Sequence, residues 1–340
     1  MNDCTADSLY ESFARPLAEL CPAAVIRRIE AEPRAGAAIW SAIDELGYAD
    51  ALVPAASGGA GLALSDVHGL LYAAGESGLP FPFGDTVVAR ALLARAGHAV
   101  AGGACTAIAQ SLDRGDGAIV CGEVPGARLA RQFLVAHGDR WLLLPATAAR
   151  LEAGVYRRCS GSPAWPSADA ALASFPMGAT DAATWLNAVR TAEMAGALHA
   201  LLRQTIAYAQ ERTQFGRPLG RFQAVQQDIS VLAEQVASAA MAARLGCAGA
   251  AADEPHALRA AMARLRACEA VPPACAIAHA VHGAIGVTEE LSLGSVVTRL
   301  REWRATGMSE QRCATRIGAR VLDDGDRMLL DFILDTLAPA

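Results

Sequence analysis

The stretch that decides the fold runs from Arg203 to Gln235 and reads RQTIAYAQERTQFGRPLGRFQAVQQDISVLAEQ. On both sides of its centre, apolar residues recur at the i, i+3, i+4 spacing that is typical of amphipathic helices. Between the two patterns, Gly216, Pro218 and Gly220 interrupt the helix. We therefore expect a helical hairpin. Its apolar faces are formed by Leu198, Leu201, Leu202, Ile206 and Ala209 before the turn and by Phe222, Val225, Ile229, Leu232 and Val236 after it.

The turn of this hairpin gathers guanidinium groups, amides and an aromatic ring. Arg212, Gln214 and Phe215 stand at the end of the first helix, and Arg217 and Gln223 stand at the start of the second. A planar guanidinium makes two parallel charge-assisted hydrogen bonds to a phosphate, and a helix N-terminus adds backbone N–H groups. The turn is thus a candidate site for a pyrophosphate and an aromatic ring. A solvated, charged loop between two helices is the alternative interpretation.

The run YAQERTQFGRPLGRFQAVQ, residues 208–226, resembles the signature of the acyl-CoA dehydrogenase family, Tyr-x-x-x-Arg-x-Gln-Phe-Gly-x-Pro-Leu/Ile-x-x-Phe-Gln. In that family the turn holds the ADP half of an FAD that belongs to a neighbouring subunit. The resemblance implies that Arg212 binds the pyrophosphate and that Phe215 packs on the cofactor. It also implies polar contacts from Gln214 and Gln223, with Leu219 in the same cofactor-binding turn.

A second motif, HAVHGAIGVTEE at residues 279–290, resembles the family's Gln-x-x-Gly-Gly-x-Gly-Phe/Tyr-Thr-x-Glu. The match covers Gly283, Gly286, Thr288 and Glu290, and it fails at Ala280, where the family carries a glutamine that contacts the adenosine side of FAD. The resemblance places Gly283 and Ala284 against the cofactor. His279 and His282 stand three residues apart without a third ligand at matching spacing, so we expect no metal site.

Composition narrows the function further. The chain has 340 residues, of which 53% are hydrophobic and only 5% aromatic, which favours closely packed helices. The net charge of −6 gives no basic footprint for nucleic acid. The nine cysteines are scattered without a CxxC pair and are expected to be reduced and mostly buried. We expect no signal peptide and no membrane-spanning run, and hence a cytoplasmic protein.

The character of the chain changes twice along its length. Residues from about 6 to 100 look helical, short apolar runs between Gly, Asp and Pro indicate strands from about 105 to 178, and helical patterns return from about 180. A new helix is expected beyond Pro272-Pro273. We predict a mainly α fold with a small central β-domain, divided into residues 1–104, 105–178 and 179–340. The resemblance implies a barrel-like middle domain and a C-terminal four-helix bundle.

The expected catalytic base is missing. Desaturation of an acyl-CoA needs a carboxylate that removes the α-proton while the flavin takes the β-hydride. The family places its glutamate at one of two positions, which fall on Thr306 and Leu186 in this chain. Glu193 is a weaker candidate for the base, because a lone acid in an apolar helix is usually paired; Arg190 and Arg203 are the candidate partners.

The sequence thus predicts FAD-dependent α,β-desaturation of an acyl-CoA thioester. The chain is expected to be the base-lacking subunit of a mixed tetramer that handles a bulky acyl chain such as a steroid side chain, with an electron-transfer flavoprotein or a similar acceptor. Two alternatives stay open. A non-catalytic assembly subunit without flavin is favoured by Ala280 and by the absence of the family's Thr/Ser-rich flavin run. A homotetrameric enzyme would use Glu193 as its base.

Overall fold

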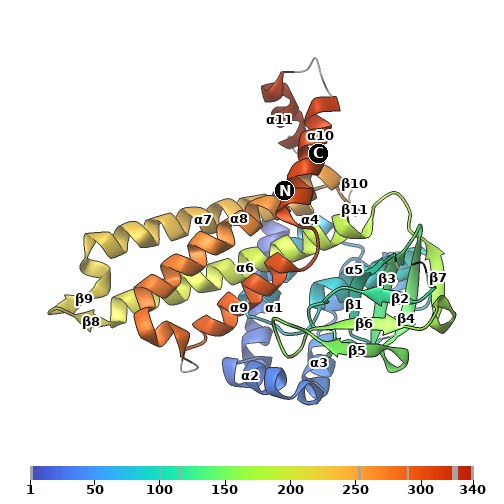
Figure 1. Ribbon diagram of the computed structural model, residues 1–340, viewed down its shortest axis with the longest axis horizontal. Coiled ribbons are helices and arrows are strands. Elements are labelled where there is room, and N and C mark those ends of the chain that lie inside the picture. Colours follow the sequence, from blue (N-terminus) through green and yellow to red (C-terminus); the bar gives the residue numbers. More distant parts are fainter. Residues whose placement is uncertain are drawn as a thin grey trace.

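Two groups of helices flank a mixed β-sheet in the computed structural model (Figure 1). The long C-terminal helices lie side by side, and the sheet lies at one end of them, next to the N-terminal helices. This arrangement confirms the predicted mainly α fold with a central β region. The structure describes residues 3–100, 102–113, 115, 117–251, 254–288, 291–323 and 328–337.

The N-terminal helices pack on the first helix of the C-terminal group, which spans Ala182–Glu211 (α6). The crossing with α4 is tight because a Cβ on Gly75 would lie 1.9 Å from the Glu193 carbonyl oxygen, and one on Gly196 would lie 2.0 Å from the Tyr72 carbonyl oxygen. Glycine at both positions lets the two backbones touch. The helices are α1 (Asp3–Leu20), α2 (Ala23–Ala31), α3 (Ala37–Asp44), α4 (Leu64–Glu76) and α5 (Phe83–Arg95).

The seven strands of the middle region form one sheet in the order β5-β6-β2-β1-β3-β4-β7. Only β1 and β3 pair in parallel. The sheet is curled, as contacts between strands that are not neighbours show. Trp165 of β6 packs edge-to-face against Phe133 of β3 and donates from Nε1 to the Pro145 carbonyl at the end of β4. The strands are β1 (Thr106–Leu112), β2 (Ile119–Cys121), β3 (Gln132–His137), β4 (Arg140–Pro145), β5 (Arg150–Ala153), β6 (Gly161–Trp165) and β7 (Ala173–Pro176).

The C-terminal helices are centred on α6, which begins at a helix cap: the Asp181 side chain accepts a hydrogen bond from the Thr184 amide at 2.7 Å. α6, α7 and α8 pack against one another around an apolar core rich in alanine. The remaining elements are β8 (Thr213–Gln214), β9 (Arg217–Pro218), α7 (Gln223–Cys247), β10 (Gly249–Ala251), β11 (Glu254–Pro255), α8 (Ala257–His282), α9 (Leu293–Ala305), α10 (Glu310–Asp323) and α11 (Leu329–Leu337).

The expected helix break at Pro272-Pro273 was wrong, since α8 runs without interruption from Ala257 to His282. Pro272 is exposed and Pro273 is half-buried, whereas the residues on either side, Val271 and Ala274, are buried. Water can therefore bind the carbonyl groups that lose their partners. Burial of the opposite face holds the helix together.

α8 also corrects the expectation that no segment is long and apolar enough to span a bilayer. Residues Ala257–Val287 meet that criterion by length and composition, with a hydropathy of 1.4 in an 18-residue window. In the structure 44% of that window is buried, and α8 packs against α6 and α7. The core helix of a folded bundle passes the same test, so this is weak support for a membrane span.

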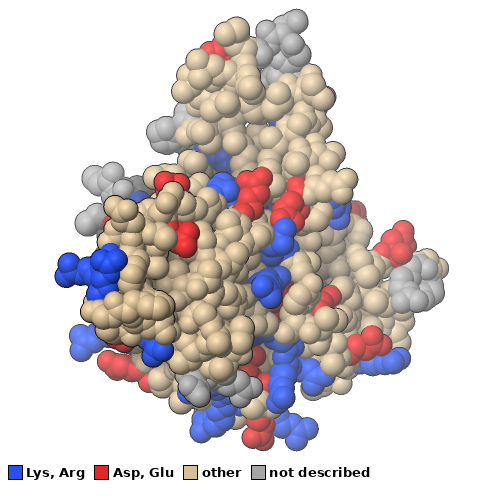
Figure 2. Space-filling model, turned by 60° about the vertical axis from the view of Figure 1, so that its left-hand side comes forward, with Lys and Arg blue, Asp and Glu red and all other residues tan. Residues whose placement is uncertain are grey.

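The last two helices project from the body, at the top of Figure 1. Figure 2 shows this projection with few charged side chains, whereas acidic and basic groups are intermixed on the body below it. Large apolar side chains are exposed there, including Leu322, Met328, Leu329, Leu330 and Leu334. Exposed apolar patches of this kind are typical of protein–protein contacts.

The cysteines follow the expectation wherever their side chains are described. Cys21, Cys105, Cys121, Cys159, Cys247, Cys268, Cys275 and Cys313 are all buried free thiols. Burial raises the pKa of these thiols, for example to about 12 for Cys121. They are therefore inert core residues.

Candidate functional site

The predicted hairpin is present, and its turn has a defined geometry. α6 ends at Glu211, α7 begins at Gln223, and the short strands β8 and β9 pair between them. At the tip Phe215 and Gly216 have φ angles of 53° and 76°, which matches a tight two-residue turn between antiparallel strands. The Leu219 amide donates to the Arg212 carbonyl at 2.9 Å and closes the base of the turn.

The side chains of this turn face solvent. Phe215 is 89% exposed, and Arg212, Gln214 and Gln223 are exposed as well. Arg217 lies over the ring of Phe222 at 4.1 Å, whereas the Arg212 guanidinium has no hydrogen bond or ion pair within the described part of the chain. An unpaired guanidinium beside an exposed aromatic ring offers phosphate-binding and stacking groups that this chain does not itself use.

The second motif lies next to the hairpin. The His282 ring stacks on that of Tyr208, one turn before Arg212, with the ring centroids 4.4 Å apart. α8 ends there, Gly283 has a φ of 65°, and both Gly283 and Ala284 are exposed. Packing therefore brings together two motifs that are about seventy residues apart in the sequence. Glu290 of the second motif lies outside the described residues.

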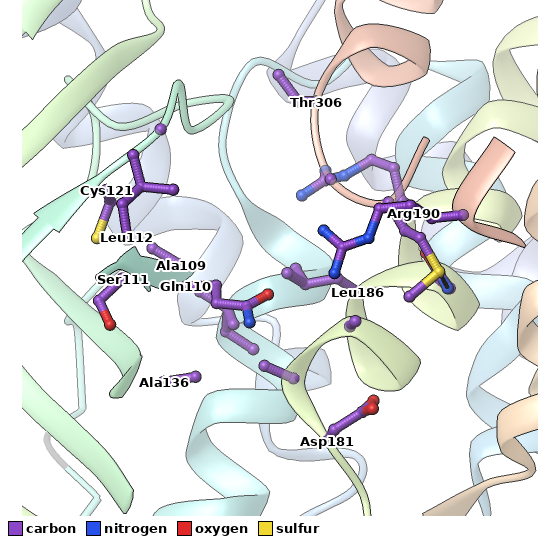
Figure 3. A pocket seen from close by; sticks show the side chains of 18 of the residues that line it. Ala109, Gln110, Ser111, Leu112, Cys121, Ala136, Asp181, Leu186, Arg190 and Thr306 are labelled. Atoms are coloured by element: carbon purple, nitrogen blue, oxygen red, sulfur yellow. Dashed lines mark hydrogen bonds between the residues drawn. The ribbon is translucent and has the colours of Figure 1, made fainter. Parts of the chain in front are cut away.

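A large cavity lies at the other end of α6, with a volume of about 1230 Å³. The sheet forms one side of it, and the start of α6, the loop after α9 and α10 form the other (Figure 3). Small side chains account for much of its width, among them Ala109, Ala136, Ala182, Ala183 and Gly307. Gln110 and Ser111 supply polar groups from β1, although the Ser111 hydroxyl bonds His137 Nδ1 at 3.0 Å.

Leu186 and Thr306 both line this cavity, although 120 residues separate them in the sequence. The structure thus brings the two predicted base positions to one wall, and neither carries a carboxylate. Thr306 donates from its hydroxyl to the Glu302 carbonyl at 2.9 Å, which caps the end of α9.

The acids that do line the cavity are occupied. Asp181 caps α6 and pairs with Arg316 at 3.3 Å. Glu123 accepts from the amides of Val155 and Tyr156 at 3.0 and 3.2 Å. Asp113 accepts from the Gly115 amide at 3.2 Å. Each of these carboxylates has a role in the fold, and none of the three is an unpaired acid on the wall.

Glu193 lies behind the wall, in a buried cluster of charges. Its carboxylate accepts from Arg190 Nη1 at 2.6 Å and from the Gly84 amide at 3.4 Å, and Arg190 Nη2 donates to Asp85 at 2.9 Å. Burial raises the pKa of Glu193 to about 7, against the opposing effect of Arg190. The predicted pairing with Arg190 is confirmed. Arg203 bonds Glu76 instead, at 2.8 Å.

Arg264 is a cavity residue that the sequence analysis missed. Its side chain is only 1% exposed, and Nη2 donates to the carbonyl oxygens of Trp303 and Thr306 at 2.6 and 2.7 Å. The guanidinium thereby caps the C-terminus of α9 and holds the loop that carries Thr306. An arginine within the alanine-rich run of α8 was the available signal.

The hairpin and the cavity are too far apart to serve one cofactor. Leu186 and Arg212 are 26 positions apart along α6 and its C-cap, a distance of about 39 Å at 1.5 Å per residue. An extended dinucleotide does not reach that far. The hairpin and the cavity are therefore two separate candidate sites on this chain.

Comparison with known proteins agrees with this geometry. The profile of the acyl-CoA dehydrogenase C-terminal domain matches residues 178–322. Acyl-CoA dehydrogenase IpdE2 of Mycobacterium tuberculosis is 31% identical over 297 residues, which cover 83% of this chain and 86% of the relative. The chain belongs to the acyl-CoA dehydrogenase family. It is therefore a member of an oxidoreductase family, as expected from the hairpin sequence.

Solved structures share the fold of this acyl-CoA dehydrogenase. The Tcur3481-Tcur3483 steroid ACAD G363A variant superposes with a TM-score of 0.81 at 21% identity, covering 96% of this chain and 100% of that one. The ChsE4-ChsE5 complex from Mycobacterium tuberculosis superposes with a TM-score of 0.77 at 22% identity, covering 94% of this chain and 97% of that one. PigA with FAD and proline superposes with a TM-score of 0.73 at 19% identity, covering 94% of this chain and 98% of that one. At these identities the likeness concerns the fold alone.

Proposed function

We propose that this chain is the base-lacking subunit of a two-chain, FAD-dependent acyl-CoA dehydrogenase. The observation that carries the proposal is the cavity wall, where Leu186 and Thr306 stand at both positions expected for the glutamate. The wall acids Asp113, Glu123 and Asp181 have structural partners. Removal of an α-proton needs a positioned carboxylate, so the partner subunit would supply it.

The exposed hairpin supports the cofactor assignment. Arg212 would bind the pyrophosphate of an FAD in the neighbouring subunit, and Phe215 would pack on that cofactor. Gln214, Leu219 and Gln223 would complete this contact, together with Gly283 and Ala284 at the end of α8. The Arg212 guanidinium, which has no ion pair among the described residues, and the 89% exposed Phe215 ring fit a phosphate-bearing aromatic ligand. The flavin would supply the hydride acceptor for desaturation.

A bulky acyl group and a paralogous partner are further parts of the proposal. The cavity has a volume of about 1230 Å³ and carries small side chains at several wall positions, among them Ala109, Ala136 and Ala183, which leaves room for more than a linear chain. One protein of similar fold is titled a steroid ACAD, and another is the ChsE4-ChsE5 complex, so a steroid side chain and a second family member are the specific expectations. The proposal also includes an electron-transfer flavoprotein or a similar acceptor for the electrons of the reduced flavin, and a cytoplasmic location.

The two alternatives differ in how well the geometry supports them. Use of Glu193 as the base in a homotetramer is disfavoured, because this carboxylate is 2% exposed, bonded to Arg190 and absent from the cavity wall. An assembly subunit without flavin fits the altered second motif. The unpaired Arg212 in an otherwise complete hairpin signature counts against it.

The test is dye-coupled reduction with a panel of acyl-CoAs, together with flavin content. The chain is measured alone and after co-expression with a paralogue that carries the glutamate. We expect activity only in the mixture, at least about 10²-fold above the chain alone. Robust turnover by the chain alone, abolished by Glu193→Gln, would establish the homotetramer. A colourless, inactive mixture would favour the assembly subunit.

Oligomerisation is testable separately. The projecting α10–α11 pair with its exposed leucines and the exposed hairpin both favour an obligate oligomer. Sedimentation velocity at micromolar concentration should show no stable monomer. A stable monomer would contradict the shared cofactor site.

A further inference from the structure

The cavity wall carries a guanidinium between the two positions where a base is expected. Arg190 lines the cavity one helical turn after Leu186 on α6, and both side chains share that face of the helix. In Figure 3 the Arg190 guanidinium lies between Leu186 and Thr306 and points toward the strand side of the cavity. The charged group next to the two expected base positions is therefore a cation.

Arg190 is held rigidly, yet its hydrogen-bonding capacity is not exhausted. Nη1 donates to Glu193 at 2.6 Å and Nη2 donates to Asp85 at 2.9 Å, while the Ile108 amide holds the Asp85 carboxylate at 3.1 Å. These bonds use two of the five N–H donors of a guanidinium. Nε–H has no partner among the described residues, and the side chain is only 7% exposed. Because Arg190 lines the cavity, its remaining donors are available to a ligand that enters there.

The charges around Arg190 leave room for an additional anion. Arg264 is a second buried cation on the same wall, and its hydrogen bonds to oxygen go to carbonyl groups, with no carboxylate partner in the described part of the chain. Asp85 and Glu193 are the two carboxylates bonded to Arg190, and burial raises the pKa of both, that of Glu193 to about 7. Glu302 and Arg299 lie further behind and bond to Ser160 and Glu30.

We propose that the cavity binds an acyl thioester that carries a second, free carboxylate, and that Arg190 pairs with this carboxylate. The apolar part of the acyl group would lie along the small side chains of Ala109, Ala136 and Ala183. This inference rests on the proposed function, since it names the substrate class of the same site. The attraction between a carboxylate and a guanidinium is much stronger when the guanidinium is desolvated than when both groups are in water.

The test compares matched ligands on the assembly of this chain with its partner. Calorimetry measures the binding of adipoyl-, suberoyl- and sebacoyl-CoA, which end in a carboxylate, against hexanoyl-, octanoyl- and decanoyl-CoA, which end in a methyl group. We expect at least one carboxylate-ended ligand to bind roughly ten- to hundredfold more tightly than its methyl-ended counterpart. Equal affinities for every pair, with binding intact, overturn the inference and leave the proposed function standing. Failure of all six ligands to bind overturns both.

A variant that does not disturb the buried acids separates Arg190 from the rest of the wall. Leu186→Glu places a carboxylate one turn away on the same helix face, where it can take the open donors of Arg190. The tighter binding of carboxylate-ended ligands should then disappear. Leu186→Gln, which has the shape of the glutamate variant but no charge, should keep that tighter binding. Arg190→Lys should keep part of it, because an ammonium retains the charge and loses the fork. A preference that survives in Leu186→Glu shows that the carboxylate binds elsewhere, and the assignment to Arg190 then fails.

Discussion

The two ends of helix α6 differ in how they relate to the family pattern. At its C-terminal end the hairpin matches the family signature residue by residue, yet its key side chains point into solvent. At its N-terminal end the cavity is well formed, yet Leu186 and Thr306 stand where the reacting carboxylate is expected. The hairpin thus keeps the family's residues in an exposed position, whereas the cavity lacks a carboxylate at both expected positions. The proposed mixed assembly rests on this difference.

The largest effect is expected from restoring a carboxylate to the cavity. Thr306→Glu places an acid on the wall at the cost of one hydroxyl-to-carbonyl bond. Measured with FAD present, in an assembly whose partner has its own glutamate changed to glutamine, it should raise turnover by about 10²-fold or more. Thr306→Gln is the control, since it adds the same bulk without a base. Equal turnover for the two variants would show that desaturation does not occur in this cavity.

The next effect concerns stability and separates the two ends of α6 directly. Arg190→Met leaves the buried carboxylates of Asp85 and Glu193 without their partner, which should cost about 3–5 kcal/mol in unfolding free energy. Arg212→Met removes an exposed guanidinium without an ion pair in the described structure, so its cost should stay within about 0.5 kcal/mol. Urea unfolding of both variants gives the comparison. Similar losses would mean that the hairpin arginine also supports the fold of the isolated chain.

Sequence reasoning worked best where the signals are local. Three helix breakers within five positions and two flanking apolar faces were enough to place the hairpin. The break expected at Pro272 was wrong, because the exposure of that residue depends on how α8 packs. Whether a proline ends a helix is decided in part by its tertiary environment.

The cavity was harder to predict, because distant segments build it. Ile108, Cys121, Leu186, Arg264 and Thr306 come from five parts of the chain, and no periodicity relates them. Family resemblance located Leu186 and Thr306, and geometry alone showed that they share a wall. The contact of Arg264 with the end of α9 depends on the crossing of two helices, and in the sequence Arg264 is one of several charged residues in the alanine-rich α8.

A pH profile should distinguish the acid behind the cavity from one near the surface. Burial raises the pKa of Glu193 from 4.5 to about 7 in the folded chain. The unfolded chain then loses its proton first as the pH rises. The wild type should therefore lose stability relative to Glu193→Gln between about pH 4.5 and 7, by an amount on the order of 3 kcal/mol.

Glu76 provides a control of opposite sign. Burial acts to raise the pKa of Glu76. Hydrogen bonds from His199, Tyr10 and Arg203 outweigh this effect and lower the pKa from 4.5 to about 2. Its contribution to stability is present above about pH 4.5 and is lost as the pH falls toward 2. Glu76→Gln should flatten that acidic limb and leave the limb between pH 4.5 and 7 unchanged. If Glu193→Gln left the same limb unchanged as well, the carboxylate of Glu193 would be ionised in the folded chain throughout.

The smallest expected effect tests the hairpin, and it requires the assembled protein. Arg212→Ala removes a guanidinium without a hydrogen bond or ion pair to any described residue, so the fold and the assembly should persist while FAD binds more weakly. Loss of a charge-assisted phosphate contact corresponds to roughly 1.5–3 kcal/mol, which should appear as lower flavin absorbance per protein after gel filtration. Arg212→Lys should restore only part of the flavin binding, because the ammonium is a point charge without the bidentate fork.

The neighbouring Arg217, which lies over Phe222 at 4.1 Å, is the matched control: Arg217→Ala should leave more flavin bound than Arg212→Ala. Unchanged flavin content in Arg212→Ala would remove the hairpin from the cofactor site and leave the assembly subunit as the better account of this chain.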